Sequence, residues 1–170
     1  MKTFWSSSKT VNIITLLLIS SLVLIGFFLV KDLSRTPEEC VQIAKEQMIT
    51  HNYKKAAIYL MRAAKKGLPK AQYELALMFD VGDKIPENRL EANKWMEKAA
   101  NAGMPEALYA MGVWTERGNF KEANLKAAIN YYEQAAQKGY KNAIISLIAI
   151  YADTNKDQQL FWINKLKEGK

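Results

Sequence analysis

The chain has 170 residues, of which 49% are hydrophobic, and a formal net charge of +7. A single cysteine excludes an internal disulfide, so the fold must be held by packing alone. The positive charge would suit a nucleic acid or an anionic lipid surface, but the lysines are spread along every expected helix and do not cluster. Solvated outer faces explain this pattern better, and we expect no nucleic-acid partner.

The N-terminal third of the chain begins with a short tail, residues 1–10, and an uncharged apolar run, residues 11–30. Twenty helical residues at about 1.5 Å each match the ~30 Å hydrocarbon core of a membrane. A cleaved signal peptide would have a shorter apolar region and small residues before the cleavage site, whereas this run ends in Phe28, Leu29 and Val30. We therefore expect a retained transmembrane signal anchor, with a cleaved signal as the alternative.

The orientation of this span is weakly encoded, because Lys2 and Lys9 precede it while Lys31 and Arg35 follow it. A short tail before a long C-terminal domain is the usual layout of a signal anchor. We expect a single-pass protein of a bacterial inner membrane with its C-terminal domain in the periplasm. The linker, residues 31–35, reaches at most about 18 Å, so a partner of that domain should be membrane-proximal.

Residues 36–170 repeat themselves at a spacing of 36, most visibly in Tyr59, Trp95 and Tyr131. The same spacing relates three further sets of small residues, which are Ala56, Ala92 and Ala128; Gly67, Gly103 and Gly139; and Ala71, Ala107 and Ala143. A fixed period of this length indicates stacked supersecondary units, in which each unit contacts only its neighbours.

Helix signals divide this region into four hairpins. Proline at a first helical position and a capping box at Thr36 to Glu39 start a helix, and Gly67, Gly103 and Gly139 each follow an amphipathic run that they can close. The segments 69–80, 105–116 and 141–152 have apolar residues at helical spacing. We expect eight helices in repeats of about 37–67, 69–103, 105–139 and 141–169.

The last repeat is shorter than the others and should cap the array. Phe161 stands eight residues before Gly169, as Tyr59 stands eight before Gly67. On this count Phe161 is the counterpart of Tyr59, and the loop before it has lost six residues.

Residues 53–152 resemble Sel1-like repeats, which are relatives of the tetratricopeptide repeat. The motif reads Ala71, Leu75, Ala76 and Phe79 in the first helix, then Gly82, then Ala92, Trp95, Lys98, Ala99, Ala100, Gly103 and Ala107. The resemblance implies an all-α fold, a right-handed α-solenoid of about four helix-turn-helix repeats following the transmembrane helix. Three features depart from the motif: Thr115 replaces an aromatic residue, Ile148 replaces a small one, and the loop 118–125 is unusual.

Residues that could support catalysis are scarce. His51 is the only histidine and falls in an expected turn, where a surface position is the simpler interpretation. Cys40 falls on the packed face of its helix and is expected to be a buried, inert thiol. No nucleophile, metal or phosphate-loop motif is present. We expect no enzyme, no cofactor, no metal and no small-molecule substrate.

A candidate partner-binding surface follows from the resemblance, because the first helix of each hairpin lines the concave side of such arrays. The residues expected to face this groove are Val41, Lys45, Met48, Tyr73, Leu77, Asp80, Tyr109, Val113, Glu116, Ile145 and Ala149. This aromatic and aliphatic column with an acidic edge suits a peptide with apolar anchors and a basic residue. Equally, Tyr73 and Tyr109 could simply pack between helices.

The sequence therefore favours a membrane-tethered scaffold or adaptor that binds a protein or peptide in the concave groove. One alternative is a structural single-pass subunit that packs permanently in a larger membrane complex. The other is a toxin-neutralising, immunity-type binding protein, a role that the family resemblance implies for some bacterial relatives.

Overall fold

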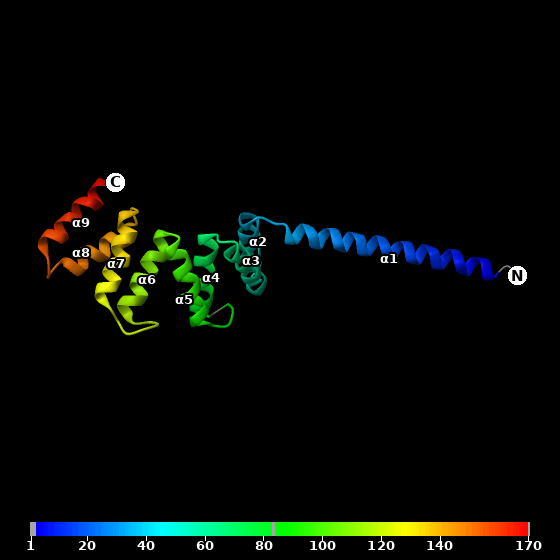
Figure 1. The fold of residues 1–170 in the computed structure, drawn as a ribbon, viewed down its shortest axis with the longest axis horizontal. Coiled ribbons are helices and arrows are strands. Elements are labelled where there is room, and N and C mark those ends of the chain that lie inside the picture. Colours follow the sequence, from blue (N-terminus) through cyan, green and yellow to red (C-terminus); the bar gives the residue numbers. More distant parts are fainter. Residues whose placement is uncertain (1–2, 83, 170) are drawn as a thin grey trace. The chain divides into compact units, whose positions relative to one another are not determined.

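The computed structural model describes residues 3–82 and 84–169, and throughout this part of the chain the secondary structure is α-helical, without a strand (Figure 1). The chain divides into two compact units, Met1–Thr36 and Pro37–Lys170. The first unit contains α1 (Thr3–Leu33). The second contains α2 (Pro37–Ile49), α3 (Tyr53–Lys65), α4 (Pro69–Val81), α5 (Arg89–Asn101), α6 (Pro105–Arg117), α7 (Leu125–Gln137), α8 (Lys141–Tyr151) and α9 (Lys156–Glu168).

The first unit is a single helix of 31 residues. Its segment Thr15–Leu33 has a mean hydropathy of 2.2 and no buried residue, so it is long and apolar enough to cross a membrane, although a signal sequence has the same properties. The hydroxyls of Ser20 and Ser21 donate to the carbonyls of Leu17 and Leu18, 2.9 and 2.8 Å away. The two serines are therefore satisfied within the helix and do not interrupt its apolar surface.

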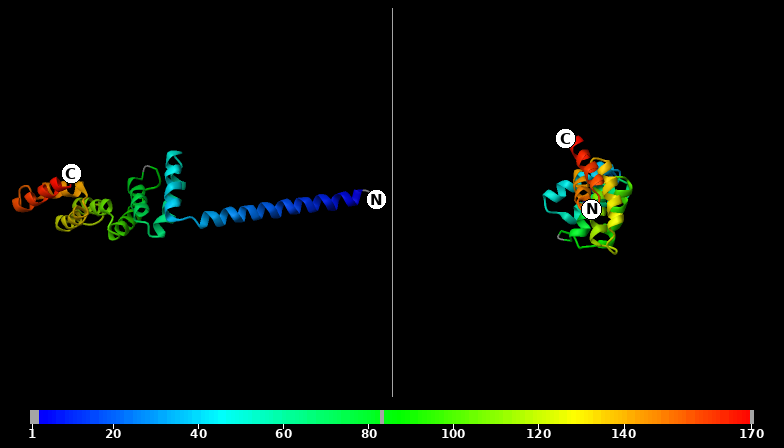
Figure 2. Two further views of the ribbon diagram at one scale, coloured as in Figure 1. Left: turned by 90° about the horizontal axis from the view of Figure 1, so that it is seen from above. Right: turned by 90° about the vertical axis from the view of Figure 1, so that its left-hand side faces the viewer.

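The second unit is built from hairpins of antiparallel neighbours, as the sequence predicted. α2 packs on α3, α4 on α5, α6 on α7 and α8 on α9, and each hairpin also contacts the next one through α3 and α4, α5 and α6, or α7 and α8. Figures 1 and 2 show these hairpins following one another in chain order. An array of this kind, in which each repeat contacts its neighbours, is an α-solenoid.

The core of the solenoid runs along the small residues of the repeat. Ala63, Ala99 and Ala135 are fully buried in the second helices of three hairpins, and Ala71 and Ala107 in the first helices. Small side chains let helix backbones approach closely, and larger side chains between the hairpins complete the packing.

The predicted glycine stops are confirmed at the ends of α3, α5 and α7. Gly103, for example, has a φ of 80°, which only glycine adopts without strain, and the next amide, that of Met104, donates to the carbonyl of Ala99 over 3.1 Å. The equivalent bond joins Tyr140 to Ala135 over 3.1 Å. α3, α5 and α7 are thereby closed in the same way, and each leads directly into the following hairpin.

The last hairpin departs from the predicted register. Trp162, and not Phe161, is the counterpart of Trp95, because both are the seventh residue after an asparagine N-cap, Asn155 and Asn88. Trp162 is 5% exposed, whereas Phe161 is 54% exposed. The prediction counted back from Gly169, but this glycine directly follows α9 and has a φ of −85°, so it does not occupy the position that Gly103 has after α5.

Candidate binding surfaces

The residues predicted to bind a partner lie on α2, α4, α6 and α8, the first helices of the four hairpins. Val41 is only 7% exposed because α2 packs this face on α3, so Val41 offers little surface to a partner. Lys45, Glu116, Ile145 and Ala149 are exposed. The half-buried members are Met48, Tyr73, Leu77, Asp80, Tyr109 and Val113.

A cluster of tyrosines connects α4, α6, α7 and the start of α8. The ring centroid of Tyr109 lies 5.6 Å from that of Tyr132 and 5.3 Å from that of Tyr140. Burial raises the pKa of Tyr73 above its ordinary value, and the neighbouring Tyr140 and Glu106 raise it further. Tyr73 and Tyr109 therefore contribute to packing between repeats while each keeps part of its surface open to solvent.

The acidic edge of this surface has two members in different environments. Glu116 accepts a hydrogen bond of 2.6 Å from the hydroxyl of Tyr132, whose pKa is raised first by burial and then by this carboxylate. Burial also raises the pKa of Asp80, partly offset by the positive charge of Arg89. One carboxylate thus fixes a buried tyrosine, and the other is partly desolvated next to an arginine.

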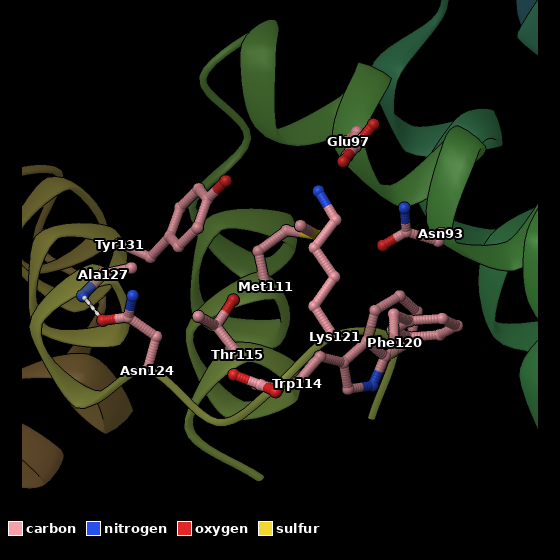
Figure 3. Close-up of a pocket in the computed structure, with 11 residues that line it drawn as sticks. Asn93, Glu97, Met111, Trp114, Thr115, Phe120, Lys121, Asn124, Ala127 and Tyr131 are labelled. Carbon is pink, nitrogen blue, oxygen red and sulfur yellow. Dashed lines mark hydrogen bonds between the residues drawn. The ribbon is translucent and has the colours of Figure 1, made fainter. Parts of the chain in front are cut away.

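A pocket of 480 Å³ lies on a different side of α6 and was not predicted from the sequence (Figure 3). At about 100° per residue, α6 carries Tyr109, Val113 and Glu116 on one side and the pocket residues on the other. α5, α6, α7 and the loop between α6 and α7 all contribute to its wall. Its principal lining residues are Glu97, Met111, Trp114, Thr115, Phe120 and Tyr131.

The loop between α6 and α7, which borders this pocket, contacts both α5 and α6. The rings of Trp114 and Phe120 lie 4.7 Å apart between centroids, and the Arg89 guanidinium sits 5.2 Å from the Phe120 ring. Arg89 also donates to the carbonyl of Asn119 over 2.9 Å. Two signals for this pocket were visible in the sequence, namely Thr115 in an aromatic position and the unusual loop 118–125, but neither reveals that the space stays open.

The residues considered for catalysis have the positions expected of them. His51 is exposed in the turn after α2 with a φ of 57°, and one of its ring nitrogens lies 3.0 Å from the hydroxyl of Tyr53. Cys40 is buried in the core. In the described ranges, 3–82 and 84–169, no group of three or more histidine, cysteine, aspartate or glutamate residues could hold a metal ion.

Comparison with known families decides what this solenoid is. The model of the Sel1 repeat matches residues 45–68, 69–104 and 105–140, which together make up more than half of the chain. The chain belongs to the Sel1 repeat family. Sel1 repeats generally mediate protein–protein interaction, and proteins of the family are typically non-catalytic.

Two solved structures have the same fold as this Sel1 repeat protein. A Sel1 repeat protein from Oxalobacter formigenes is 25% identical, with a TM-score of 0.67 over 78% of this chain and 57% of its own. A protective antigen present in uropathogenic Escherichia coli strains, which displays an SLR fold, is 19% identical, with a TM-score of 0.68 over 78% of this chain and 31% of its own. The present chain thus spans only part of the length of either protein. No curated protein sequence matches it.

Proposed function

We propose that this Sel1 repeat protein is a membrane-tethered scaffold that binds a protein or peptide along the first helices of its hairpins. The observation that carries the proposal is the pair Tyr73 and Tyr109, which occupy the same position in successive repeats and remain half-exposed. Tyrosines are well suited to binding surfaces because each combines a large apolar ring with a polar hydroxyl.

The chemistry of the surface limits what the partner can be. Leu77 and Val113 follow the two tyrosines by four residues, so each repeat presents an aromatic and an aliphatic side chain one helical turn apart. Asp80 and Glu116 extend the column as carboxylates. The surface suits an extended or helical segment with apolar anchors and a basic residue, from a protein at or near the membrane.

Membrane tethering in this proposal rests on α1. Its apolar segment Thr15–Leu33 is long enough to span a bilayer, and only Ser34, Arg35 and Thr36 separate α1 from α2. Three residues extend to about 11 Å at most, so a solenoid anchored by α1 has its first helix close to the bilayer surface. We place the solenoid in the periplasm of a bacterium, with α1 in the inner membrane.

A permanently packed structural subunit is the second candidate, and one observation favours it. Leu160 and Phe161 are adjacent on α9 and are 57% and 54% exposed. Contiguous exposed apolar patches are typical of surfaces that another protein covers, and these two side chains would form part of such a patch. A permanent subunit should aggregate or unfold when purified without its complex, whereas a scaffold should remain folded.

The test compares capture of crosslinked partners from membranes by the full-length chain and by variants. Tyr73→Ala combined with Tyr109→Ala removes two adjacent anchors, each worth roughly 1–3 kcal/mol of binding, and should reduce capture at least about tenfold. Leu90→Ala is the control, since it removes an exposed apolar side chain from α5, away from this column, and should leave capture unchanged. Trp95→Ala should instead cost ~3–5 kcal/mol of stability, because Trp95 is buried.

Circular dichroism of the same variants separates binding from folding. The proposal requires the double tyrosine variant to keep the helicity and melting temperature of the parent while losing its partner. If the double variant unfolds as Trp95→Ala does, the tyrosines serve packing alone. If it stays folded and still captures the partner, the binding surface lies elsewhere on the solenoid.

A further inference from the structure

The pocket beside α6 lies at a position where the neighbouring repeats carry an aromatic ring. Phe79, Thr115 and Tyr151 occupy equivalent places, 36 residues apart, at the ends of α4, α6 and α8. Phe79 and Tyr151 are both half-buried. Thr115 lines the pocket with a side chain far shorter than either ring. The middle repeat therefore lacks the ring that its two neighbours supply from their own sequence.

The partner of each ring lies on the preceding helix and matches the ring in polarity. Phe79 and Met61 of α3 line the same hollow, so at this place an apolar ring is matched with an apolar side chain. The hydroxyl of Tyr151 donates to Glu133 of α7 over 3.5 Å, so a phenol meets a carboxylate. The chain thus pairs phenylalanine with methionine and tyrosine with glutamate at this place in the repeat.

The middle repeat keeps the glutamate of the tyrosine–glutamate pair but lacks the tyrosine. Glu97 is the residue 36 positions before Glu133, and it lines the pocket. Glu97 is exposed to solvent, and within the described part of the chain its carboxylate makes no hydrogen bond or ion pair. Figure 3 shows Lys121 reaching from the loop toward the same end of the pocket as Glu97 and Asn93. A phenol donor entering the pocket would find an acceptor in the position that Glu133 has for Tyr151.

The remaining walls suit the flat faces of an aromatic ring. Met111, Trp114, Phe120 and Tyr131 provide a thioether and three aromatic surfaces around the 480 Å³ volume, which lies within the range of ligand pockets. Aromatic rings pack on one another in offset or edge-to-face geometries, and methionine adapts its shape to a neighbouring ring. The loop that carries Phe120 is fixed by Arg89, so much of this wall exists before a ligand arrives.

We propose that this pocket binds a tyrosine side chain of a protein partner, with the tyrosine hydroxyl donating a hydrogen bond to Glu97. The incoming ring would take the place that Tyr151 fills in the following repeat. The pocket shares no residue with the surface of Tyr73 and Tyr109, so the two proposed binding sites can be tested independently of each other.

The binding test uses the full-length chain in lipid nanodiscs with ¹⁵N-labelled tryptophan indoles. The probe is a glycine-tyrosine-glycine peptide blocked at both ends, and the same peptide with phenylalanine is the comparison. We expect the Trp114 indole signal to shift and saturate with a Kd in the millimolar range, as suits so small a ligand. The Trp162 signal, from the far hairpin, should not move. The phenylalanine peptide should bind about fivefold more weakly, since it lacks the hydrogen bond.

Two variants test the assignment of residues. Thr115→Tyr places a ring of the chain itself in the pocket. This variant should lose peptide binding, and its melting temperature should be equal to or higher than that of the parent chain. Glu97→Leu should remove the preference for tyrosine over phenylalanine. Its matched control is Glu133→Leu, which deletes the equivalent carboxylate of the next repeat and should leave the preference intact.

Several results would overturn the proposal. One is the absence of a saturable Trp114 shift, and another is equal binding of the tyrosine and phenylalanine peptides. A third is binding of free p-cresol without binding of the tyrosine peptide, which would make this a pocket for small phenols. A tyrosine preference that survives in Glu97→Leu would also contradict it, and this result remains informative even if Thr115→Tyr fails to fold.

Discussion

Gly112 and Thr115 lie about one turn apart on α6. Both are smaller than their counterparts in the next repeat, Ile148 and Tyr151. At Gly112 the space is taken by the ring of Tyr132, which is 1% exposed. At Thr115 the space stays open as part of the pocket. The sequence marks both positions as small, but only the structure distinguishes them, because a gap is filled or left open by side chains from other helices.

The close contact at Gly112 gives a prediction for Gly112→Ala. Alanine in a helix interior is ordinarily favoured over glycine by up to about 1 kcal/mol. Here a Cβ at residue 112 would lie 2.5 Å from Cε1 and 2.6 Å from Cδ1 of Tyr132. The ring would have to shift away from its hydrogen bond with Glu116, so we expect a net destabilisation of about 1–3 kcal/mol, measured as a lower melting temperature of the repeat helices by circular dichroism.

A second substitution separates this steric effect from a general intolerance at α6. Tyr132→Leu removes the ring, so Gly112→Ala added to it should cost much less than it costs in the parent chain. Such non-additivity is the signature of two residues in contact. A higher melting temperature for Gly112→Ala alone would show that the ring has room to move.

At the scale of the helix, three of the four second helices begin with the same cap. The side chains of Asn88, Asn124 and Asn155 accept hydrogen bonds from the amides of Glu91, Ala127 and Gln158, at 3.1, 2.9 and 3.1 Å. α3 also begins after an asparagine, Asn52, but this side chain makes no cap hydrogen bond. The four positions therefore form a natural comparison between bonded and unbonded caps.

We expect Asn88→Ala, Asn124→Ala and Asn155→Ala each to lower the free energy of unfolding by about 1 kcal/mol. Asn52→Ala is the internal control and should have much less effect, because no cap bond is lost. Denaturant titration of the four variants, followed by helicity, measures the differences. Equal losses at all four positions would mean that the asparagines act through something other than the cap hydrogen bond.

The helices themselves were largely predictable because their limits are set by local chemistry. Pro37, Pro69 and Pro105 stand at the starts of α2, α4 and α6, and Gly103 and Gly139 follow the ends of α5 and α7 with positive φ. The register of α9 was predicted wrongly because it was measured from a glycine, Gly169, that adopts an ordinary negative φ. A glycine permits a left-handed residue but does not require one.

The candidate site was less predictable than the helices. The 36-residue repeat places Tyr73 and Tyr109 on equivalent helix faces, but the ring of Tyr109 packs beside Tyr140, a tyrosine that the repeat period does not predict. Val41 sits in the corresponding column of the first hairpin and is nevertheless buried. Position in a repeat fixes the face of a helix, whereas exposure depends on what the neighbouring helices place against that face.

At the scale of the whole chain, an apolar helix joins a solenoid whose repeats contact only their neighbours, and the orientation of that helix decides where a partner is met. We expect α1 to be retained, with its N-terminus in the cytoplasm and the solenoid outside it. Alkaline extraction should then leave the full-mass chain in the membrane pellet, because Thr15–Leu33 is long enough to span the bilayer. A phosphatase fused after the solenoid should be active, and the same enzyme fused before α1 should not.

Release of a chain about 3 kDa lighter would show that the segment is a cleaved signal. An inactive C-terminal fusion with the chain still in the pellet would show the opposite topology, since the lysines and the arginine on the two sides of the apolar run are nearly balanced in number.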